Sequence, residues 1–286
     1  MRDILFRCSS IGKLMTEPVS IDASLRTPDV EAIIRKTKRS DEEKEVLAIL
    51  KKKTLSETAK TYIRELVSQE IFGVDFDIGG KPIEKGIEVE EESIGLLNRV
   101  RGLRLQKNTK RLDNGFITGE CDLFDATRRR GHDIKSSWSI ATFPILPSAC
   151  VDQLYEWQMR GYMMLWDADE WEVNYCLVDT PERLLGYEPL QLHIVSHIPE
   201  YMRLTTWTVT RDAQKEAAIL EKIELARAYF HEVVREFEHT HPNGVPDWHK
   251  EAPVANSGPA PIPARAAPAP NPIPSPAAPA ALPELF

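Results

Sequence analysis

Gly119-Glu-Cys-Asp-Leu-Phe-Asp125 and, after a short basic break, His132-Asp-Ile-Lys-Ser-Ser-Trp138 are the stretches that most constrain the fold of this 286-residue chain. Polar and apolar side chains alternate in both, which is typical of β-strands that bury one face. Alternation places Asp133 and Lys135 on the same face of the second strand. Asp122 can join them from the first strand, because its apolar neighbours anchor the opposite face. We therefore expect two adjacent strands that bring two carboxylates and one amine together.

This grouping has a chemical interpretation and a structural one. Two carboxylates can bind a hard divalent cation, and a lysine beside them can steady an attacking water molecule and a phosphate. Gly119 has no side chain, so we expect it to leave room for a metal or a phosphate near the acids. The structural alternative is an exposed pair of strands with a cross-strand Asp–Lys ion pair, and spacing alone favours it.

A third acid precedes the strands, in a helix that we predict over residues 87–100. Ile87 and Ile94 mark its buried stripe, and Glu90 lies three residues after the first and four before the second, so it should point inward. An inward-facing glutamate is unfavourable unless a cation meets it, and a bound metal would supply one. Acids in a first helical turn also suit the helix dipole. The choice between Glu90 and Glu91 stays open.

Gln158 and Tyr162 form a fourth element. They are four residues apart in a helix that we predict over residues 152–166, so they share one face. An amide and a phenol there can bind the phosphates of a nucleic acid or order the lysine. The other expected elements are helices over residues 41–53, 56–72 and 211–238, and strands over residues 116–124, 132–137, 170–178 and 202–210. This order favours an α/β fold with a central sheet flanked by helices.

The composition changes sharply near Trp248, which predicts a folded domain over residues 1–248 and a tail over residues 249–286. From residue 251 to residue 286, 11 of 36 residues are proline and another 11 are alanine. Such a segment cannot bury a core, so we expect a disordered, partly polyproline tether. Its apolar tip, Ala281-Leu-Pro-Glu-Leu-Phe286, is either a partner-binding peptide or part of an ordinary disordered tail.

The net charge of −8 hides local clusters of cations. Six Lys or Arg residues and no acid occur between Arg99 and Arg111, and Arg128-Arg129-Arg130 forms a second cluster. We interpret them as a rim that faces a polyanion, the alternative being a solvated surface. Four scattered cysteines without a CxxC pair argue against a zinc or iron–sulfur site. With no apolar run long enough for a membrane span and no signal peptide, we expect a cytoplasmic protein.

In chain order, the motifs are Gly86-x-x-x-Glu90, Gly119-x-x-Asp122, Asp133-x-Lys135 and Gln158-x-x-x-Tyr162. They resemble the PD-(D/E)XK nuclease superfamily, and in particular its phage lambda exonuclease-type branch of YqaJ-like viral recombinases. The segment Arg7-Cys-Ser-Ser-Ile-Gly-Lys-Leu-Met15 is similar to the Arg/Ser helix start of that branch. The resemblance covers residues 7–162 and implies a restriction-endonuclease-like core, which is a central mixed β-sheet flanked by helices.

The resemblance also implies a role for each residue. The residues expected to ligate one or two Mg²⁺ or Mn²⁺ ions are Glu90, Asp122, Asp133 and, through its backbone carbonyl, Ile134. Lys135 would position the attacking water. The residues expected to bind DNA are Arg7 and Ser10 at a 5′-phosphorylated end, and Gln158, Tyr162, Arg128, Arg129 and Arg130 along the strand. Gln158 and Tyr162 would also support the lysine.

We therefore expect a metal-dependent DNA exonuclease that resects duplex ends, 5′→3′, in phage-type recombination or repair within the bacterial cytoplasm. Double-stranded DNA ends would be its substrate, and the tail could hold a single-strand annealing protein, a single-strand-binding protein or a sliding clamp. Lambda-type relatives form a ring, so a homo-oligomer is a further expectation. One alternative is an endonuclease or recombination-repair nuclease of the same fold. Another is a non-catalytic DNA-binding or scaffold protein.

Overall fold

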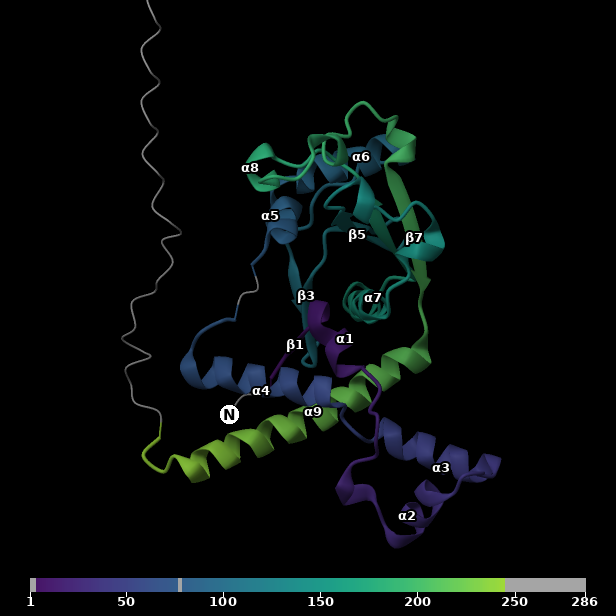
Figure 1. Cartoon of the computed structure of the whole chain (residues 1–286), viewed down its shortest axis with the longest axis vertical. Coiled ribbons are helices and arrows are strands. Elements are labelled where there is room, and N and C mark those ends of the chain that lie inside the picture. The colour runs from purple at the N-terminus through teal and green to yellow at the C-terminus, as the bar shows by residue number, and fades with distance from the viewer. Residues whose placement is uncertain (1–3, 77–78, 245–286) are drawn as a thin grey trace, which may run out of the picture. The chain divides into compact units, whose positions relative to one another are not determined.

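The computed structural model describes residues 4–76 and 79–244, all of which belong to a unit that spans Met1–Val245 (Figure 1). The predicted boundary near Trp248, the tail over residues 249–286 and its tip at residues 281–286 lie outside the described residues. No helix within the described part of the chain is long and apolar enough to span a membrane.

After the first strand the chain runs through a block of helices and then a block of strands, and helices and strands alternate from there on. The helices are α1 (Ile11–Leu14), α2 (Pro28–Arg35), α3 (Asp41–Lys52), α4 (Glu57–Phe72), α5 (Lys81–Glu88), α6 (Glu90–Arg101), α7 (Gln153–Trp166), α8 (Glu182–Leu185) and α9 (Ala213–Thr240). The strands are β1 (Phe6–Arg7), β2 (Arg111–Asp113), β3 (Ile117–Glu120), β4 (Leu123–Asp125), β5 (Arg130–Ser136), β6 (Glu170–Cys176) and β7 (Leu204–Thr210).

The strands form two mixed sheets. In the first, β3 lies between β1, its parallel neighbour, and β2, its antiparallel neighbour. The order of the second sheet is β4-β5-β6-β7, in which β5 and β6 are parallel and the other neighbours are antiparallel. Helices flank the strands, which confirms the predicted α/β class with mixed sheets (Figure 1).

The predicted strand over residues 116–124 is divided between the two sheets. β3 ends just before Cys121, and β4 begins just after Asp122. Asn108 accounts for the break, because its backbone N–H donates to the Asp122 carbonyl at 2.7 Å and its side-chain amide donates to the Cys121 carbonyl at 3.0 Å. Both carbonyls thus accept hydrogen bonds from Asn108, outside the hydrogen-bond ladder of a continuous sheet. The prediction of one central sheet is wrong in this respect.

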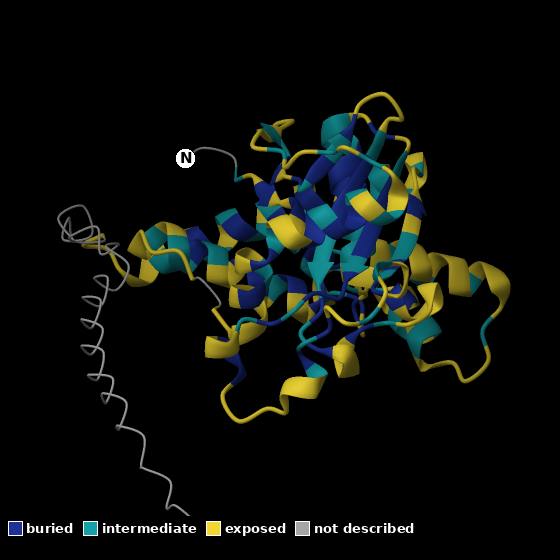
Figure 2. Cartoon of the chain, turned by 90° about the horizontal axis from the view of Figure 1, so that it is seen from above, coloured by how far each residue is buried: buried dark blue, intermediate teal, exposed yellow. Residues whose placement is uncertain are grey.

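Apolar side chains cover both faces of the second sheet. On one face, Trp171 and Val173 of β6 belong to the largest core, which α4, α7 and α9 also enter. On the other face, Ile134 of β5 packs with Ile94 and Leu97 of α6. Figure 2 shows the buried residues gathered around the strands. The candidate residues on β5 therefore lie in a strand whose two faces are both covered.

Most predicted helices are confirmed to within about two residues at each end; they are those over residues 41–53, 56–72, 152–166 and 211–238. Side-chain caps fix two of the starts: Ser56 accepts a hydrogen bond from the N–H of Ala59, and Asp152 accepts from Leu154 and Tyr155. The predicted helix over residues 87–100 is wrong at its start, since α5 and α6 are separate helices that meet at Val89.

Candidate active site

Asp122 and Asp133 lie opposite each other where β4 meets β5. The antiparallel register pairs Leu123 with His132. Asp122, one residue before Leu123, therefore lies across from Asp133, one residue after His132. Asp122 Oδ2 accepts a hydrogen bond from the backbone N–H of Ile134 at 2.6 Å. Burial, and then the charge of Asp133, raise the pKa of Asp122 to about 7. Two carboxylates therefore share a small buried volume that favours a cation.

Lys135 supplies a cation on the same face of β5. Its Nζ lies 2.8 Å from Asp133 Oδ2 and 4.4 Å from the centre of the Tyr155 ring. Burial on its own would lower the pKa of Lys135, but the charge of Asp133, its hydrogen bond with the ammonium and the nearby Tyr155 and Asp122 together outweigh burial and raise this pKa above its usual range. The lysine therefore stays protonated at neutral pH.

Gln158 and Tyr162 on α7 hold Asp133 from the other side. Gln158 Nε2 donates to Asp133 Oδ1 at 3.5 Å and to the Tyr162 hydroxyl at 3.2 Å, and that hydroxyl donates to the Glu120 carbonyl at 3.1 Å. Burial raises the pKa of Tyr162 above its usual range. The two residues are only 7% and 5% exposed. The expected contact of their side chains with DNA does not fit this burial, and their partner is Asp133 rather than Lys135.

Gly119 serves a different purpose from the one predicted. A Cβ atom at this position would lie 2.8 Å from Tyr162 Cε1 and 2.9 Å from Cys8 Sγ. The missing side chain thus leaves room for Tyr162 and Cys8 to pack against β3, and not for a metal or a phosphate. The packing partners come from distant parts of the chain, which is why the local sequence could not identify them.

The start of α6 differs from the predicted inward-facing stripe. Ile87 is 74% exposed, because α5 ends at Glu88 and its last turn directs this side chain to solvent. Val89 is buried in its place and packs with Leu96 of α6. Glu90 is the first residue of α6, so it lies on the turn between the two helices. The predicted stripe through Ile87 is therefore wrong, although Ile94 is buried as expected, together with Leu96 and Leu97.

Glu90 is nevertheless the acid that faces the aspartates. Its carboxylate is half-buried and forms an ion pair with Lys107, while Glu91 is exposed. The charge of Glu90 contributes to the raised pKa of Asp122. The hydrogen bond to Glu90 raises the pKa of Lys107, and Asp122 adds to that shift. A lysine ammonium thus lies among the acids that the sequence predicts as metal ligands.

The donor set suits a hard divalent cation in part. Within residues 4–76 and 79–244, no three His, Cys, Asp or Glu side chains lie close enough together to form a complete metal site. Asp122 and Asp133 supply carboxylate oxygens, and the backbone of Ile134 adds a carbonyl. These are the oxygen donors that Mg²⁺ and Mn²⁺ prefer. Burial, and then the charge of Asp133, disfavour the charged form of Asp122. A cation beside the pair would offset both effects, so the residues present fit such an ion.

Arg7 and Ser10 lie around Tyr62 at a second place on the molecule. Arg7 lines a cavity of about 350 Å³ together with Tyr62 and Asp75, and its guanidinium lies 3.5 Å from the Asp75 carboxylate. Burial raises the pKa of Tyr62, and its hydrogen bond with Ser10 acts against that shift. The structure therefore brings the two residues predicted for the 5′-phosphate to one phenol.

Arg128, Arg129 and Arg130 are paired within the protein. Their carboxylate partners are Asp125 for Arg128, Asp167 and Asp169 for Arg129, and Glu170 and Glu172 for Arg130. Each guanidinium is thus paired with an acid from its own turn, from the segment that leads into β6, or from β6 itself. This arrangement differs from the predicted DNA-facing cluster, because partners about 40 residues away in sequence were not considered.

Lys107 and Tyr155 were missed by the sequence analysis. Lys107 belongs to the basic run that was interpreted as a rim, and nothing in its spacing points to Glu90. Tyr155 lies three residues before Gln158 on α7, so helical spacing could have placed it on the same face. The aromatic ring beside Lys135 was therefore open to prediction, whereas the partner of Glu90 was not.

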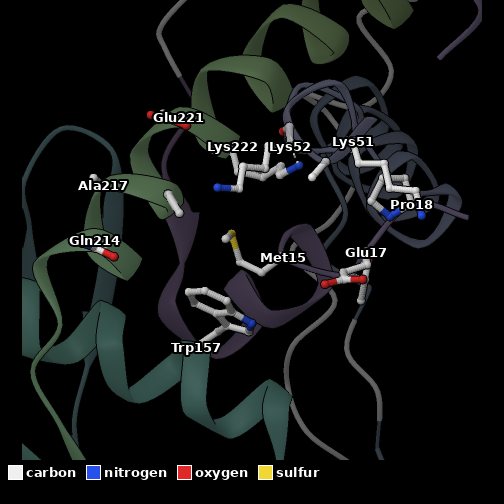
Figure 3. A pocket seen from close by; sticks show the side chains of 13 residues that line it. Met15, Glu17, Pro18, Lys51, Lys52, Trp157, Gln214, Ala217, Glu221 and Lys222 are labelled. Carbon is white, nitrogen blue, oxygen red and sulfur yellow. Dashed lines mark hydrogen bonds between the residues drawn. The ribbon is translucent and has the colours of Figure 1, made fainter. Parts of the chain in front are cut away.

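A separate cavity of about 450 Å³ lies between α1, α3, α7 and the start of α9 (Figure 3). Met15 and Trp157 line it together with Lys51, Lys52 and Lys222. None of the residues predicted for catalysis or DNA binding lines this cavity, so it is distinct from the candidate active site.

Mixed sheets flanked by helices, an Asp133-x-Lys135 strand and a facing Asp122 define a nuclease core of the PD-(D/E)XK type. A phage-related exonuclease from Haemophilus somnus 129PT is 33% identical, with a TM-score of 0.68 over 82% of this chain and 97% of that one. The chain therefore belongs to the family of phage-type exonucleases, as the motifs implied, and it is a nuclease.

An alkaline exonuclease from Laribacter hongkongensis is 12% identical, with a TM-score of 0.53 over 84% of this chain and 94% of that one, and shares the fold. No family model and no curated protein matches the chain.

Proposed function

We propose that this nuclease is a Mg²⁺- or Mn²⁺-dependent DNA exonuclease that degrades duplex ends, 5′→3′, in phage-type recombination or repair. The observation that carries the proposal is the approach of Asp122, Asp133 and Lys135 at one edge of the second sheet. Membership of the exonuclease family supports it.

The roles of the side chains follow from their surroundings. Asp122, Asp133, the Ile134 carbonyl and Glu90 would hold the cation, which when bound supplies positive charge beside the scissile phosphate. Lys135 stays protonated, so its ammonium can donate hydrogen bonds to a phosphate oxygen and to the attacking water.

Gln158 fixes the other oxygen of Asp133 and so limits rotation of that carboxylate. Asp122 and Asp133 thus form a carboxylate pair in fixed positions beside the ammonium of Lys135.

Arg7 and Ser10 are the residues that we propose for the terminal phosphate. The guanidinium of Arg7 is exposed at a cavity of about 350 Å³ and can form charge-assisted hydrogen bonds with a phosphate. Its contact with Asp75 is 3.5 Å long and exposed, so it should exchange readily for a stronger anion. Selection of a 5′-phosphorylated end would give the enzyme its direction.

A paired digestion tests the proposal. Linear 5′-phosphorylated duplex and closed circular duplex are each incubated with Mg²⁺, with EDTA and with the Lys135→Ala variant. Lys53→Ala, at the exposed end of α3, is the matched control. We expect loss of the linear DNA alone, with wild-type protein and with Lys53→Ala, and no loss with EDTA or Lys135→Ala.

Two other outcomes would point to the alternatives. Cutting of the circle would indicate an endonuclease of the same fold. DNA binding without any product, in Mg²⁺ and in Mn²⁺, would contradict the proposal and favour a non-catalytic DNA-binding protein. A homo-oligomer and a partner of the tip at residues 281–286 stay predictions, to be tested by mass measurement in solution and by pull-down with a single-strand annealing protein, a single-strand-binding protein or a sliding clamp.

A further inference from the structure

Lys85 of α5 has a side chain that is fully buried, at 0% exposure. Its ammonium donates hydrogen bonds to three backbone carbonyls: that of Ser137 at 2.6 Å, that of Val178 at 2.9 Å and that of Trp138 at 3.2 Å. Among the residues that the structure describes, no carboxylate lies within hydrogen-bonding distance of it. Burial lowers the pKa of Lys85 to about 8.

Burying a lysine at this position costs free energy. The cost is offset only if its ammonium makes interactions that an apolar side chain cannot make. Taking an ammonium out of water carries a large desolvation penalty, and a methionine of similar volume would avoid it. Only a cationic donor group of this reach can bind three carbonyls at once. The positions of these three carbonyls therefore indicate the role of Lys85.

The three carbonyls lie where β5 and β6 end and their chains diverge. Ser137 and Trp138 follow Lys135 by two and three residues, and Val178 follows the last residue of β6 by two. The Trp138 carbonyl also accepts a hydrogen bond from the Thr180 hydroxyl at 2.9 Å. Lys85 thus anchors the segment that directly follows the candidate catalytic lysine.

Lys85 is also linked to Glu90, through the backbone at the end of α5. The N–H of Val89 donates to the Lys85 carbonyl at 2.9 Å and caps the end of α5 one residue before Glu90. Beyond Glu90, the hydroxyl of Ser93 lies 2.8 Å from that of Ser136 on β5. The glutamate is therefore held between two links that join its helices to the end of β5.

We propose that Lys85 is a positioning residue of the active site, which fixes the separation between Glu90 and the Asp133-x-Lys135 strand and thereby sets the affinity for the divalent cation. The proposal rests on the proposed function, since it assigns Glu90 and Asp133 to one cation. Groups that orient metal ligands typically change metal affinity by about 10- to 100-fold when they are removed.

Lys222 of α9 offers a matched control for Lys85. It is 8% exposed, its ammonium donates to the carbonyls of Lys52 at 2.8 Å and Thr54 at 2.9 Å, and burial lowers its pKa. It ties α9 to the connection between α3 and α4, away from the candidate active site. Replacing each lysine by methionine removes a buried ammonium from backbone carbonyls in both cases.

The experiment measures Mn²⁺ binding to the DNA-free protein by calorimetry, together with kcat and KM on a 5′-phosphorylated duplex. We expect Lys85→Met to weaken Mn²⁺ binding by about tenfold or more and to lower kcat, with KM for DNA little changed. Lys222→Met should shift the melting temperature by a similar amount but leave Mn²⁺ binding unchanged. Equal Mn²⁺ affinity in wild type and Lys85→Met would overturn the proposal.

A milder variant decides the question if Lys85→Met does not fold. Thr180→Val keeps the shape of the side chain and removes one donor from the Trp138 carbonyl, so we expect a smaller loss of Mn²⁺ affinity in the same direction. No loss in a folded Thr180→Val would then overturn the proposal. A wild-type protein that binds Mn²⁺ but digests no DNA would instead count against the proposed function.

Discussion

The carboxylate of Asp122 accepts a hydrogen bond from the backbone N–H of Ile134 at 2.6 Å, so a side chain from the break between the two sheets takes the place of a backbone carbonyl as the acceptor for this N–H of β5. This contact fixes the carboxylate beside Asp133, in a buried environment that disfavours its charge. Structure and ionisation are therefore coupled at this residue.

Asp122→Asn should stabilise the metal-free protein at about pH 8. The pKa of Asp122 rises from 3.8 to about 7 on folding, so between these values the folded state binds more protons than the unfolded state. The free energy of unfolding therefore falls as the pH rises through this window, and the loss persists above it. Asparagine keeps an oxygen for the Ile134 N–H and carries no charge.

Thermal unfolding in EDTA checks this expectation. The variant should have the higher melting temperature at about pH 8, and its advantage should shrink toward about pH 4, where Asp122 is protonated in the folded state and close to half protonated in the unfolded state. A variant that melts at or below the wild-type temperature at about pH 8 would contradict the raised pKa.

Gln158→Leu should lower activity by about tenfold, because it removes the hydrogen bonds to Asp133 and Tyr162 that orient the carboxylate. Gln153→Leu, at the exposed start of the same helix, is the control. Initial rates on linear duplex at saturating Mg²⁺ provide the measurement. If both variants retain the wild-type rate, Gln158 does not orient the catalytic acid.

Lys107→Met should tighten Mn²⁺ binding by about two- to fivefold. The variant frees Glu90 from an ion pair that is partly exposed, and such pairs contribute about 0.2–1 kcal/mol. Calorimetry at low salt measures the change. Lys110→Met, three residues further along the same basic run, should leave the affinity unchanged. Weaker binding by Lys107→Met would mean that the lysine helps to assemble the acids instead of competing for one of them.

Gly119→Ala should destabilise the fold by about 1–3 kcal/mol, because the added methyl group would meet Tyr162 and Cys8 at less than 3.0 Å. Gly86→Ala on α5 is the matched control, since a Cβ atom there meets nothing within 4 Å and alanine favours a helix. Denaturant unfolding gives both values. A Gly119→Ala protein as stable as wild type would show that the packing against β3 is loose.

The sequence was sufficient for features that depend on local periodicity. Alternation places Asp133 and Lys135 on one face of β5 and Ile134 on the other, and the structure shows this arrangement. Helical spacing likewise identifies Gln158 and Tyr162 as neighbours on α7, which hydrogen-bond to each other. These patterns are set by backbone geometry alone and need no knowledge of distant residues.

Features that depend on distant partners were not predictable. Asn108 breaks the strand before Asp122, and Lys107 pairs with Glu90, although no pattern near either acid identifies them. The cations of Arg129 and Arg130 meet acids that follow α7, so a basic cluster in the sequence becomes a set of ion pairs in the fold. Tertiary contacts decide such cases.

The hydrogen bonds from Gln158 through Tyr162 to the Glu120 carbonyl join strands of different sheets, since Asp133 belongs to β5 and Glu120 to β3. A single turn of α7 thus acts as a brace across the gap between the sheets. The two sheets can separate only if these hydrogen bonds break, and Asp133 then loses its contact with Gln158. Any adjustment to a bound substrate must therefore come from the connections around the strands. The strands that carry the candidate catalytic residues keep their positions relative to each other.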